Sequence, residues 1–321
     1  MPTQFGIVAA RFRRKGSGQT TTIDGMPVRL LPGLPRYVDG ALAVNGDGLS
    51  YDSAHNTLQN AVTAASRDES IYVRPKAVGN FYTENVVIPS ATKAGLSVVG
   101  VTYSKGNSVY QACTFRGVVA VDSAIIEARS SFFHAENLHF WSRAAQTHGF
   151  GVMGRWNTGS GLNIGSSLVN CSFAQDVDDA EAAGGVVQSA IRLDSTEGWL
   201  IEDCFFQDCR VGISLGSTVS ACYSIVIHHN HFGGLASKIA ADLMISDSYR
   251  SMITDNHFAH AKPSNGAGSM NEYVFVIGGS TTTGYFGGNH QGAADVASAT
   301  NNNLGSLILG GNFGSGGPWT S

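Results

Sequence analysis

The chain reads Asp203-Cys204-Phe205-Phe206, then His229-Asn230-His231-Phe232, then Asp255-Asn256-His257-Phe258, three copies of one phrase set 26 residues apart. In each copy, polar or small residues stand three and two positions before a phenylalanine. Further copies lie on both sides and end at Phe115, Phe140, Phe173, Gln291 and Phe313. Repetition every 22 to 33 residues is typical of stacked supersecondary units and not of a single globular core.

A second phrase precedes the first in most repeats. Its copies include Ile191-Arg192-Leu193-Asp194-Ser195, Ile213-Ser214-Leu215-Gly216-Ser217 and Leu243-Met244-Ile245-Ser246-Asp247. Alternating apolar residues predict short, half-buried strands, and the Gly, Ser and Asp residues that follow them favour turns. Another short strand, such as Trp199-Leu200-Ile201-Glu202, then leads into the phenylalanine phrase. Two or three strands per repeat, without a helical pattern, predict coils of parallel β-structure that bury their apolar side chains by stacking.

The position two residues before each phenylalanine forms a column of mixed composition. It holds Cys113, Leu138, Cys171, Cys204, Asn230, Asn256, Asn289 and Gly311. This mixture indicates an inward-facing corner, where stacked asparagines would hydrogen-bond along the axis because buried amides need partners. Three of the five cysteines then become small core residues. The alternative is a disulfide or metal site, but the cysteine spacing matches no zinc pattern.

On these phrases the chain resembles the right-handed parallel β-helix (pectin lyase-like) superfamily. That superfamily holds pectate lyases, pectin methylesterases and many phage tailspike and virion proteins, and the virion members are the most similar in character. The segment from Asn45-Gly46-Asp47-Gly48 to Gly100 resembles the N-terminal part of such proteins. The resemblance covers roughly residues 40–315. It implies the fold and leaves the activity open, because the superfamily contains both enzymes and structural proteins.

The chain is therefore predicted to be all-β, with one β-helix over residues 39–315. An extended N-terminal arm over residues 1–38 precedes it, and a Gly-rich tail over residues 316–321 follows it. Within the β-helix, residues 53–66 predict a short capping α-helix with Asp52 or Ser53 as its N-cap. Its apolar face would consist of Ala54, Leu58, Ala61, Val62 and Ala65. Such a helix covers the open end of the solenoid, where unpaired strand edges invite aggregation.

Composition narrows the classes of function. Charged residues make up only 14% of the chain and glycines number 40, which favours a turn-dense β-solenoid. The net charge of −4 argues against nucleic acid as a partner. No apolar run approaches the length of a membrane span, and the N-terminus lacks the apolar core of a signal peptide. We therefore expect synthesis in a host cytoplasm, no membrane partner and no cofactor.

The arm carries a basic and aromatic cluster. It consists of Arg11, Phe12, Arg13, Arg14 and Lys15. Prolines such as Pro2, Pro27 and Pro32 indicate an extended segment with no core of its own, which must lie on another surface. We predict that the cluster docks on an acidic surface of a partner; the alternative is a solvated charge cluster.

An acidic segment follows the repeat that ends at Phe173. Its carboxylates belong to Asp176, Asp178, Asp179 and Glu181. Alternating carboxylates offer the oxygen ligands that Ca²⁺ prefers. The spacing, however, lacks the glycine and the terminal glutamate of an EF-hand loop. A solvated lateral loop is the favoured interpretation, with calcium as the alternative.

The position three residues before phenylalanine brings together the strongest catalytic candidates. Asp203, His229 and Asp255 would lie on successive coils, and such a carboxylate–imidazole–carboxylate column suits general acid–base chemistry. The favoured interpretation is a hydrogen-bonded ladder that terminates each strand. A metal site among the nearby histidines is disfavoured, because strand alternation would send His228 to the face opposite His229.

We see no match to the pectate-lyase or pectin-methylesterase active sites, and the missing motifs favour a non-enzyme without excluding catalysis. The predicted function is a structural virion protein of a tailed bacteriophage, either a capsid decoration (cement) protein or a small tail spike or fibre. It would form a homotrimer and dock on a capsid or tail protein through its arm. One alternative is a polysaccharide lyase or hydrolase that uses Trp141, Trp156, Tyr249 and the aspartate–histidine column. Another is an adhesin that binds a host surface glycan without cleaving it.

Overall fold

The structure is a computed structural model of the 321-residue chain. It describes residues 20–23, 26–29, 34–77, 80–89, 92–102, 113–117, 124–142, 151–155, 162–174, 189–207, 209, 211–216, 220–234, 241–260, 273–277, 282–291, 300–301, 306–311, 313–314 and 317–318.

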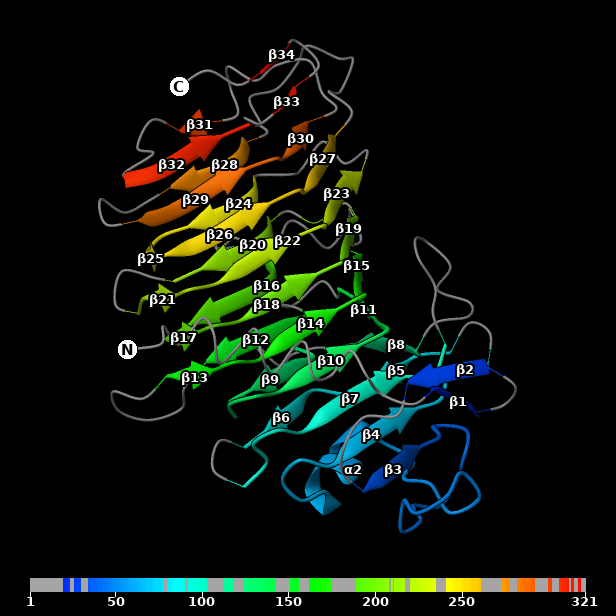
Figure 1. Cartoon of the computed structure of the whole chain (residues 1–321). Helices are drawn as coiled ribbons and strands as arrows, with labels where there is room; N and C mark the ends of the chain where they lie inside the picture. Colours follow the sequence, from blue (N-terminus) through cyan, green and yellow to red (C-terminus); the bar gives the residue numbers. More distant parts are fainter. Residues whose placement is uncertain are drawn as a thin grey trace, which may run out of the picture.

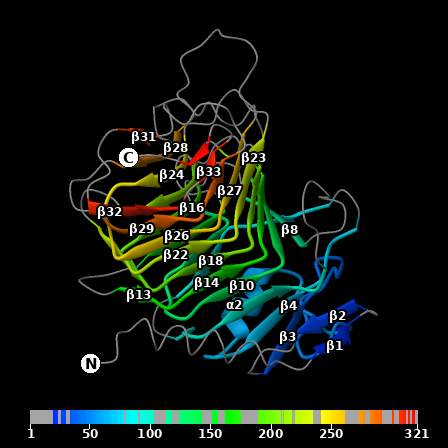
Figure 2. The ribbon, with the colours of Figure 1, turned by 45° about the horizontal axis from the view of Figure 1, so that its top comes forward.

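The described residues form a right-handed parallel β-helix, as the sequence predicts (Figure 1). The solenoid has three long sheets, which we number 1, 2 and 3 in the order in which the chain passes through them. In the middle of the solenoid, each coil also passes through a fourth, short sheet before it returns to sheet 1. Figure 2 shows successive coils turning from sheet 1 into sheet 2 at the same corner. No helix among the described residues is long and apolar enough to cross a membrane.

Sheet 1 contains ten parallel strands within the described part of the chain. In spatial order they are β3 (Pro35–Val38), β4 (Ser70–Val73), β7 (Ser97–Gly100), β10 (His134–Glu136), β14 (Ser167–Val169), β18 (Leu200–Glu202), β22 (Val226–His228), β26 (Ser251–Thr254), β29 (Thr283–Gly287) and β32 (Ser306–Gly310).

Sheet 2 also has ten described strands, all parallel except the last, which turns back on its neighbour. They are β5 (Tyr82–Thr83), β8 (Cys113–Arg116), β11 (Leu138–Trp141), β15 (Ser172–Ala174), β19 (Phe205–Gln207), β23 (His231–Gly234), β27 (His257–His260), β30 (His290–Gln291), β33 (Phe313–Gly314) and β34 (Gly317–Pro318).

Sheet 3 has eight described strands: β6 (Val86–Ile88), β9 (Ile126–Ala128), β12 (Val152–Arg155), β16 (Ser189–Asp194), β20 (Val211–Leu215), β24 (Ala241–Ile245), β28 (Tyr273–Ile277) and β31 (Thr300–Asn301). Sheet 4 has four: β13 (Asn163–Ile164), β17 (Thr196–Glu197), β21 (Cys222–Tyr223) and β25 (Ser248–Tyr249). Outside the solenoid, β1 (Thr20–Ile23) and β2 (Met26–Arg29) form an antiparallel hairpin.

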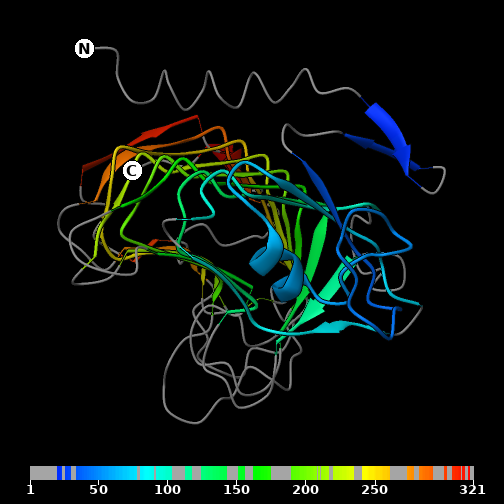
Figure 3. The same cartoon turned by 90° about the horizontal axis from the view of Figure 1, so that it is seen from below.

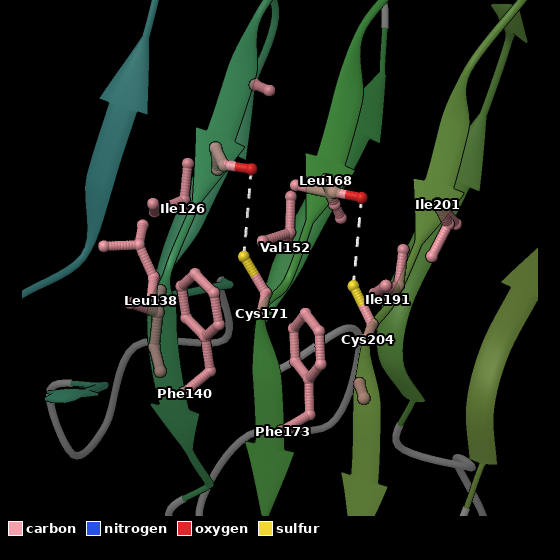
Figure 4. Close-up of a cluster of buried hydrophobic side chains, with 14 of the residues drawn as sticks. Ile126, Leu138, Phe140, Val152, Leu168, Cys171, Phe173, Ile191, Ile201 and Cys204 are labelled. Carbon is pink, nitrogen blue, oxygen red and sulfur yellow. Dashed lines mark hydrogen bonds between the residues drawn. The ribbon is translucent and has the colours of Figure 1, made fainter. Parts of the chain in front are cut away.

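The phenylalanines of the repeated phrase lie directly above one another inside sheet 2. Phe140 pairs in register with Phe173, and the column continues through Phe206, Phe232 and Phe258. The Phe173 and Phe206 ring centroids are 5.0 Å apart and those of Phe206 and Phe232 are 4.5 Å apart, with nearly parallel planes. Figure 4 shows Phe140 and Phe173 side by side on neighbouring strands. The prediction of continuous inward columns is confirmed.

The asparagine column forms the predicted ladder at the inward corner. Asn256 Oδ1 accepts hydrogen bonds from both the backbone N and Nδ2 of Asn230, each at 3.0 Å. In the same way, Asn289 Oδ1 accepts hydrogen bonds from the backbone N and Nδ2 of Asn256, again at 3.0 Å each. At the lower end, Asn230 Oδ1 accepts from the backbone N of Cys204 at 2.9 Å. These amides are fully buried, so the ladder satisfies polar groups that water cannot reach.

The cysteines are core residues, and none forms a disulfide. All five are buried and free. Cys171 Sγ donates to the carbonyl of Ala135 and Cys204 Sγ to that of Leu168, each at 3.8 Å (Figure 4). Burial raises the pKa of the Cys113 thiol to about 11, which keeps it protonated at neutral pH. The interpretation of the column cysteines as small apolar residues is therefore confirmed.

A capping helix, α2 (Leu58–Ala64), lies at the N-terminal end of the spiral (Figure 3). Its N-cap is Thr57, whose Oγ1 accepts from the backbone N of Asn60 at 3.1 Å. The prediction of Asp52 or Ser53 as N-cap is wrong, because the Ser53 hydroxyl donates to Asp47 in the preceding turn. The predicted apolar face is buried throughout, although Ala54 and Ala65 lie just outside the helix.

The first strand of the solenoid begins earlier than the sequence indicates. β3 (Pro35–Val38) lies within the segment predicted as an arm, yet it pairs in parallel with β4 (Ser70–Val73). Proline is tolerated as the first residue of an edge strand, because there it has no ladder hydrogen bond to donate. Pro35 lies within the segment predicted as an extended arm, and it is the first residue of the first strand of the β-helix.

Candidate functional site at the corner between sheets 1 and 2

On the coils from β10 to β32, one residue of left-handed backbone conformation makes the turn from sheet 1 into sheet 2. The φ angles are 53° at Asp203 and 56° at both His229 and Asp255. Asn137, Asn170 and Gly288 have the same conformation on other coils. Asn, Asp, His and Gly are the residues that adopt it most readily. The column predicted three positions before phenylalanine therefore exists, and its composition first of all meets a backbone requirement.

Nine outward-facing residues surround this turn on three consecutive coils, and we call them the corner patch. Sheet 1 contributes one row, the left-handed turn the second and sheet 2 the third. The row on sheet 1 consists of Glu202, His228 and Thr254. The row at the turn consists of Asp203, His229 and Asp255. The row on sheet 2 consists of Phe205, His231 and His257. All nine are half-buried or exposed. Parallel pairing repeats each row at the strand spacing of about 4.8 Å.

Glu202 and His228 form an ion pair across β18 and β22. Glu202 Oε1 lies 3.1 Å from His228 Nε2. The hydrogen bond from His228 lowers the pKa of the Glu202 carboxyl. The same bond raises the pKa of His228, and the negative charges of Asp203 and Asp255 add to this rise. The pair thus favours a charged carboxylate beside a readily protonated imidazole.

His228 and His229 lie together, contrary to the expectation that they face opposite sides. Their ring centroids are 4.6 Å apart. Strand alternation ends at His228, and the positive φ of His229 turns its side chain back around the corner. The side chains converge with that of Glu202, so that three ligand atoms, one each from Glu202, His228 and His229, lie within 4.8 Å of one another. Sequence reasoning missed Glu202 and set His228 aside by placing it on the opposite face, although each stands one position before the predicted column.

The third row presents flat rings on the outer face of sheet 2. Phe205 and His231 stack with centroids 4.9 Å apart and planes inclined by 10°. His231 and His257 approach through their Nδ1 atoms at 3.0 Å. The corner patch therefore combines aromatic rings with carboxylates, which accept hydrogen bonds, and imidazoles, which can both donate and accept them.

The other predicted site residues do not join this patch. Trp141 lies on β11, where its ring meets Phe81 edge-on at 5.3 Å and Arg116 at 5.2 Å. Tyr249 lies on sheet 4, stacked on Tyr223 at 5.2 Å. Several predictions fall outside the described residues: the arm cluster Arg11, Phe12, Arg13, Arg14 and Lys15, the calcium candidates Asp176, Asp178, Asp179 and Glu181, and Trp156.

The chain matches no known family model and no curated protein sequence. Among solved structures it is similar to a pectin methylesterase variant in complex with a hexasaccharide, with a TM-score of 0.50 and 10% identity over 89% of this chain and 91% of that one. It is also similar to the rice weevil pectin methylesterase, with a TM-score of 0.48 and 11% identity over 88% and 91%.

A third similar structure is the catalytic domain of a GH87 α-1,3-glucanase in complex with nigerose. It gives a TM-score of 0.47 and 12% identity over 92% of this chain and 48% of that one. At 10% identity and a TM-score of 0.50, the similarity to the pectin methylesterase variant shows the parallel β-helix fold alone. The phage virion assignment stays a prediction.

Proposed function

We propose that the protein is a glycan-binding β-helix that holds a polysaccharide along the corner patch. The observation that carries this proposal is the outward repetition of carboxylates, imidazoles and rings on three consecutive coils. Sugar hydroxyls donate to carboxylates and accept from imidazole N–H groups. Phe205 and His231 form a stacked pair on the outer surface, and this pair offers apolar ring surface for contact with the sugar C–H groups. A regular polymer fits a regularly repeating surface.

Binding without cleavage is favoured by the state of Glu202. A glycosidase needs one carboxylic acid whose pKa is raised, so that it can protonate the leaving group. The hydrogen bond from His228 instead lowers the pKa of Glu202. This carboxyl is therefore charged at neutral pH and cannot serve as that acid.

Saccharides are also the natural first ligands to test. A hexasaccharide is bound in the similar pectin methylesterase variant, and nigerose in the similar glucanase domain. These ligands belong to those proteins, and they guide the choice of a panel of acidic and neutral polysaccharides here.

We expect the full chain to bind at least one polysaccharide of this panel without releasing reducing ends. The double substitution Phe205→Ala and His257→Ala should weaken that binding about tenfold or more, since both side chains belong to the ring row. Tyr223→Ala, on sheet 4, is the matched control and should bind normally. Glycan arrays identify the bound polysaccharide, and titration calorimetry then compares its affinity for the unmodified chain, the double variant and the control. Absence of binding across the panel, or an equal loss in the control, would overturn the proposal.

A second candidate, the structural virion protein, is favoured by an apolar row on the outer face of sheet 1. Met252, Tyr285 and Ile308 pair in register on successive strands, with 38%, 38% and 67% of their surfaces exposed. Leu200 and Val226 continue the row. A contiguous exposed apolar surface indicates a protein contact. On this reading copies of the chain associate through sheet 1, as the predicted homotrimer, while Arg11–Lys15 dock on a capsid or tail protein.

Assembly through this row predicts a trimer in solution. Substituting Met252→Glu together with Ile308→Glu should convert the trimer to monomers, because three copies would bury six like charges in an apolar contact. Light scattering after size-exclusion chromatography measures the mass. Ser214→Glu, on the outer face of sheet 3, should leave the trimer intact. A monomeric unmodified protein at micromolar concentration would contradict this candidate.

A further inference from the structure

We infer that Glu202, His228 and His229 form a binding site for a divalent transition-metal ion of the zinc class. The inference goes beyond glycan binding and does not depend on it. Its basis is the convergence of two imidazoles and one carboxylate, with one ligand atom from each lying within 4.8 Å of the others. The three residues come from two neighbouring coils of the solenoid.

The distances suit a tetrahedral ion. Zinc bonds of about 2.0–2.2 Å place neighbouring ligand atoms of a tetrahedron about 3.3 Å apart. Glu202 Oε1 and His228 Nε2 are already separated by 3.1 Å. His229 is exposed at the turn, and one of its ring nitrogens lies within 4.8 Å of the ligand atoms of Glu202 and His228, a separation that a change of its side-chain rotamer can shorten. Three protein ligands leave the fourth tetrahedral position to a water molecule or a ligand oxygen.

The fold holds the ligand backbones in place. Parallel pairing sets Glu202 directly opposite His228. The left-handed turn then presents His229 next to His228. The following residue, Asn230, is fixed in the buried amide ladder by its bonds to Asn256. A site whose backbone is this constrained loses little conformational entropy when an ion binds.

The donor set selects the class of ion. Two imidazoles and a carboxylate are typical ligands of Zn²⁺ and its transition-metal neighbours, whereas Ca²⁺ and Mg²⁺ prefer shells of oxygen. Asp203 and Asp255 lie on the coils before and after His229, and their charges act on His228. Their negative potential attracts a cation to the same corner.

A simple ion pair between Glu202 and His228 is the competing explanation, and metal titration separates the two. The full chain, stripped with a chelator, is titrated with Zn²⁺ by calorimetry at neutral pH. Co²⁺ serves as a spectroscopic probe, because tetrahedral coordination gives it intense visible absorption. We expect one high-affinity Zn²⁺ per chain. Glu202→Gln, His228→Ala and His229→Asn should each weaken binding about tenfold or more.

His257→Ala is the matched control, because it removes a histidine of the same patch that lies outside the cluster. His229→Asn keeps a residue that tolerates the left-handed turn, and thermal unfolding checks that every variant is folded. No stoichiometric Zn²⁺ binding by the unmodified chain would overturn the inference. Loss of binding in His257→Ala but not in the three cluster variants would overturn it equally.

Discussion

Phe206→Ala is expected to destabilise the β-helix by about 3–5 kcal/mol, the range for removing a buried phenylalanine. Phe206 is only 1% exposed, and it stacks between Phe173 and Phe232 at centroid distances of 5.0 and 4.5 Å. Alanine leaves a cavity between two rings held by the registered strands β15 and β23, so the neighbours cannot close over it. Two aromatic contacts, each worth about 0.5–1.5 kcal/mol, disappear as well.

Its neighbour Phe205 provides the control. Phe205 lies on the same strand with its side chain on the outer face, half-buried against His231. Phe205→Ala should cost about 1 kcal/mol, since it removes surface contacts and creates no internal cavity. Urea unfolding followed by circular dichroism compares the two variants. Equal destabilisation by both would show that Phe206 does not occupy the interior column.

The inward columns could be predicted from the sequence because a solenoid repeats the same environment on every coil. Each phenylalanine from Phe140 to Phe258 provides an independent observation of one interior position. The helix cap had no such repetition. Ser53 and Thr57 are both suitable N-caps in sequence, and only the side-chain bond from Ser53 to Asp47 decides between them.

The corner patch shows where periodicity fails. Alternation is valid within a strand, but the left-handed residue at the turn breaks it, so the separation expected between His228 and His229 is wrong. Asp, His and Asn at that position are compatible with a catalytic column and with a backbone requirement. The φ angle shows the backbone requirement, and the proximity of Glu202 follows from strand register.

The asparagine ladder gives the second large effect. Asn256→Ala is expected to lower the free energy of unfolding by about 3 kcal/mol or more, since several buried polar groups lose partners at about 1–3 kcal/mol each. The backbone N of Asn230 loses its acceptor, and Nδ2 of Asn230 loses one acceptor while keeping the carbonyls of Ile201 and His228. The carbonyl of Ile227 and Oδ1 of Asn289 lose a donor. Thermal and urea unfolding measure the loss.

Asn256→Cys separates ladder bonding from volume. Cysteine fits this column on lower coils, where Cys204 Sγ donates to the carbonyl of Leu168. At position 256 a thiol replaces the donor to Ile227 and fills the corner, but it is a weak acceptor for the backbone N of Asn230. We expect the free energy of unfolding of Asn256→Cys to lie between that of the unmodified chain and that of Asn256→Ala. A cysteine variant as stable as the unmodified chain would mean that volume at the corner, and not the amide ladder, holds these coils together.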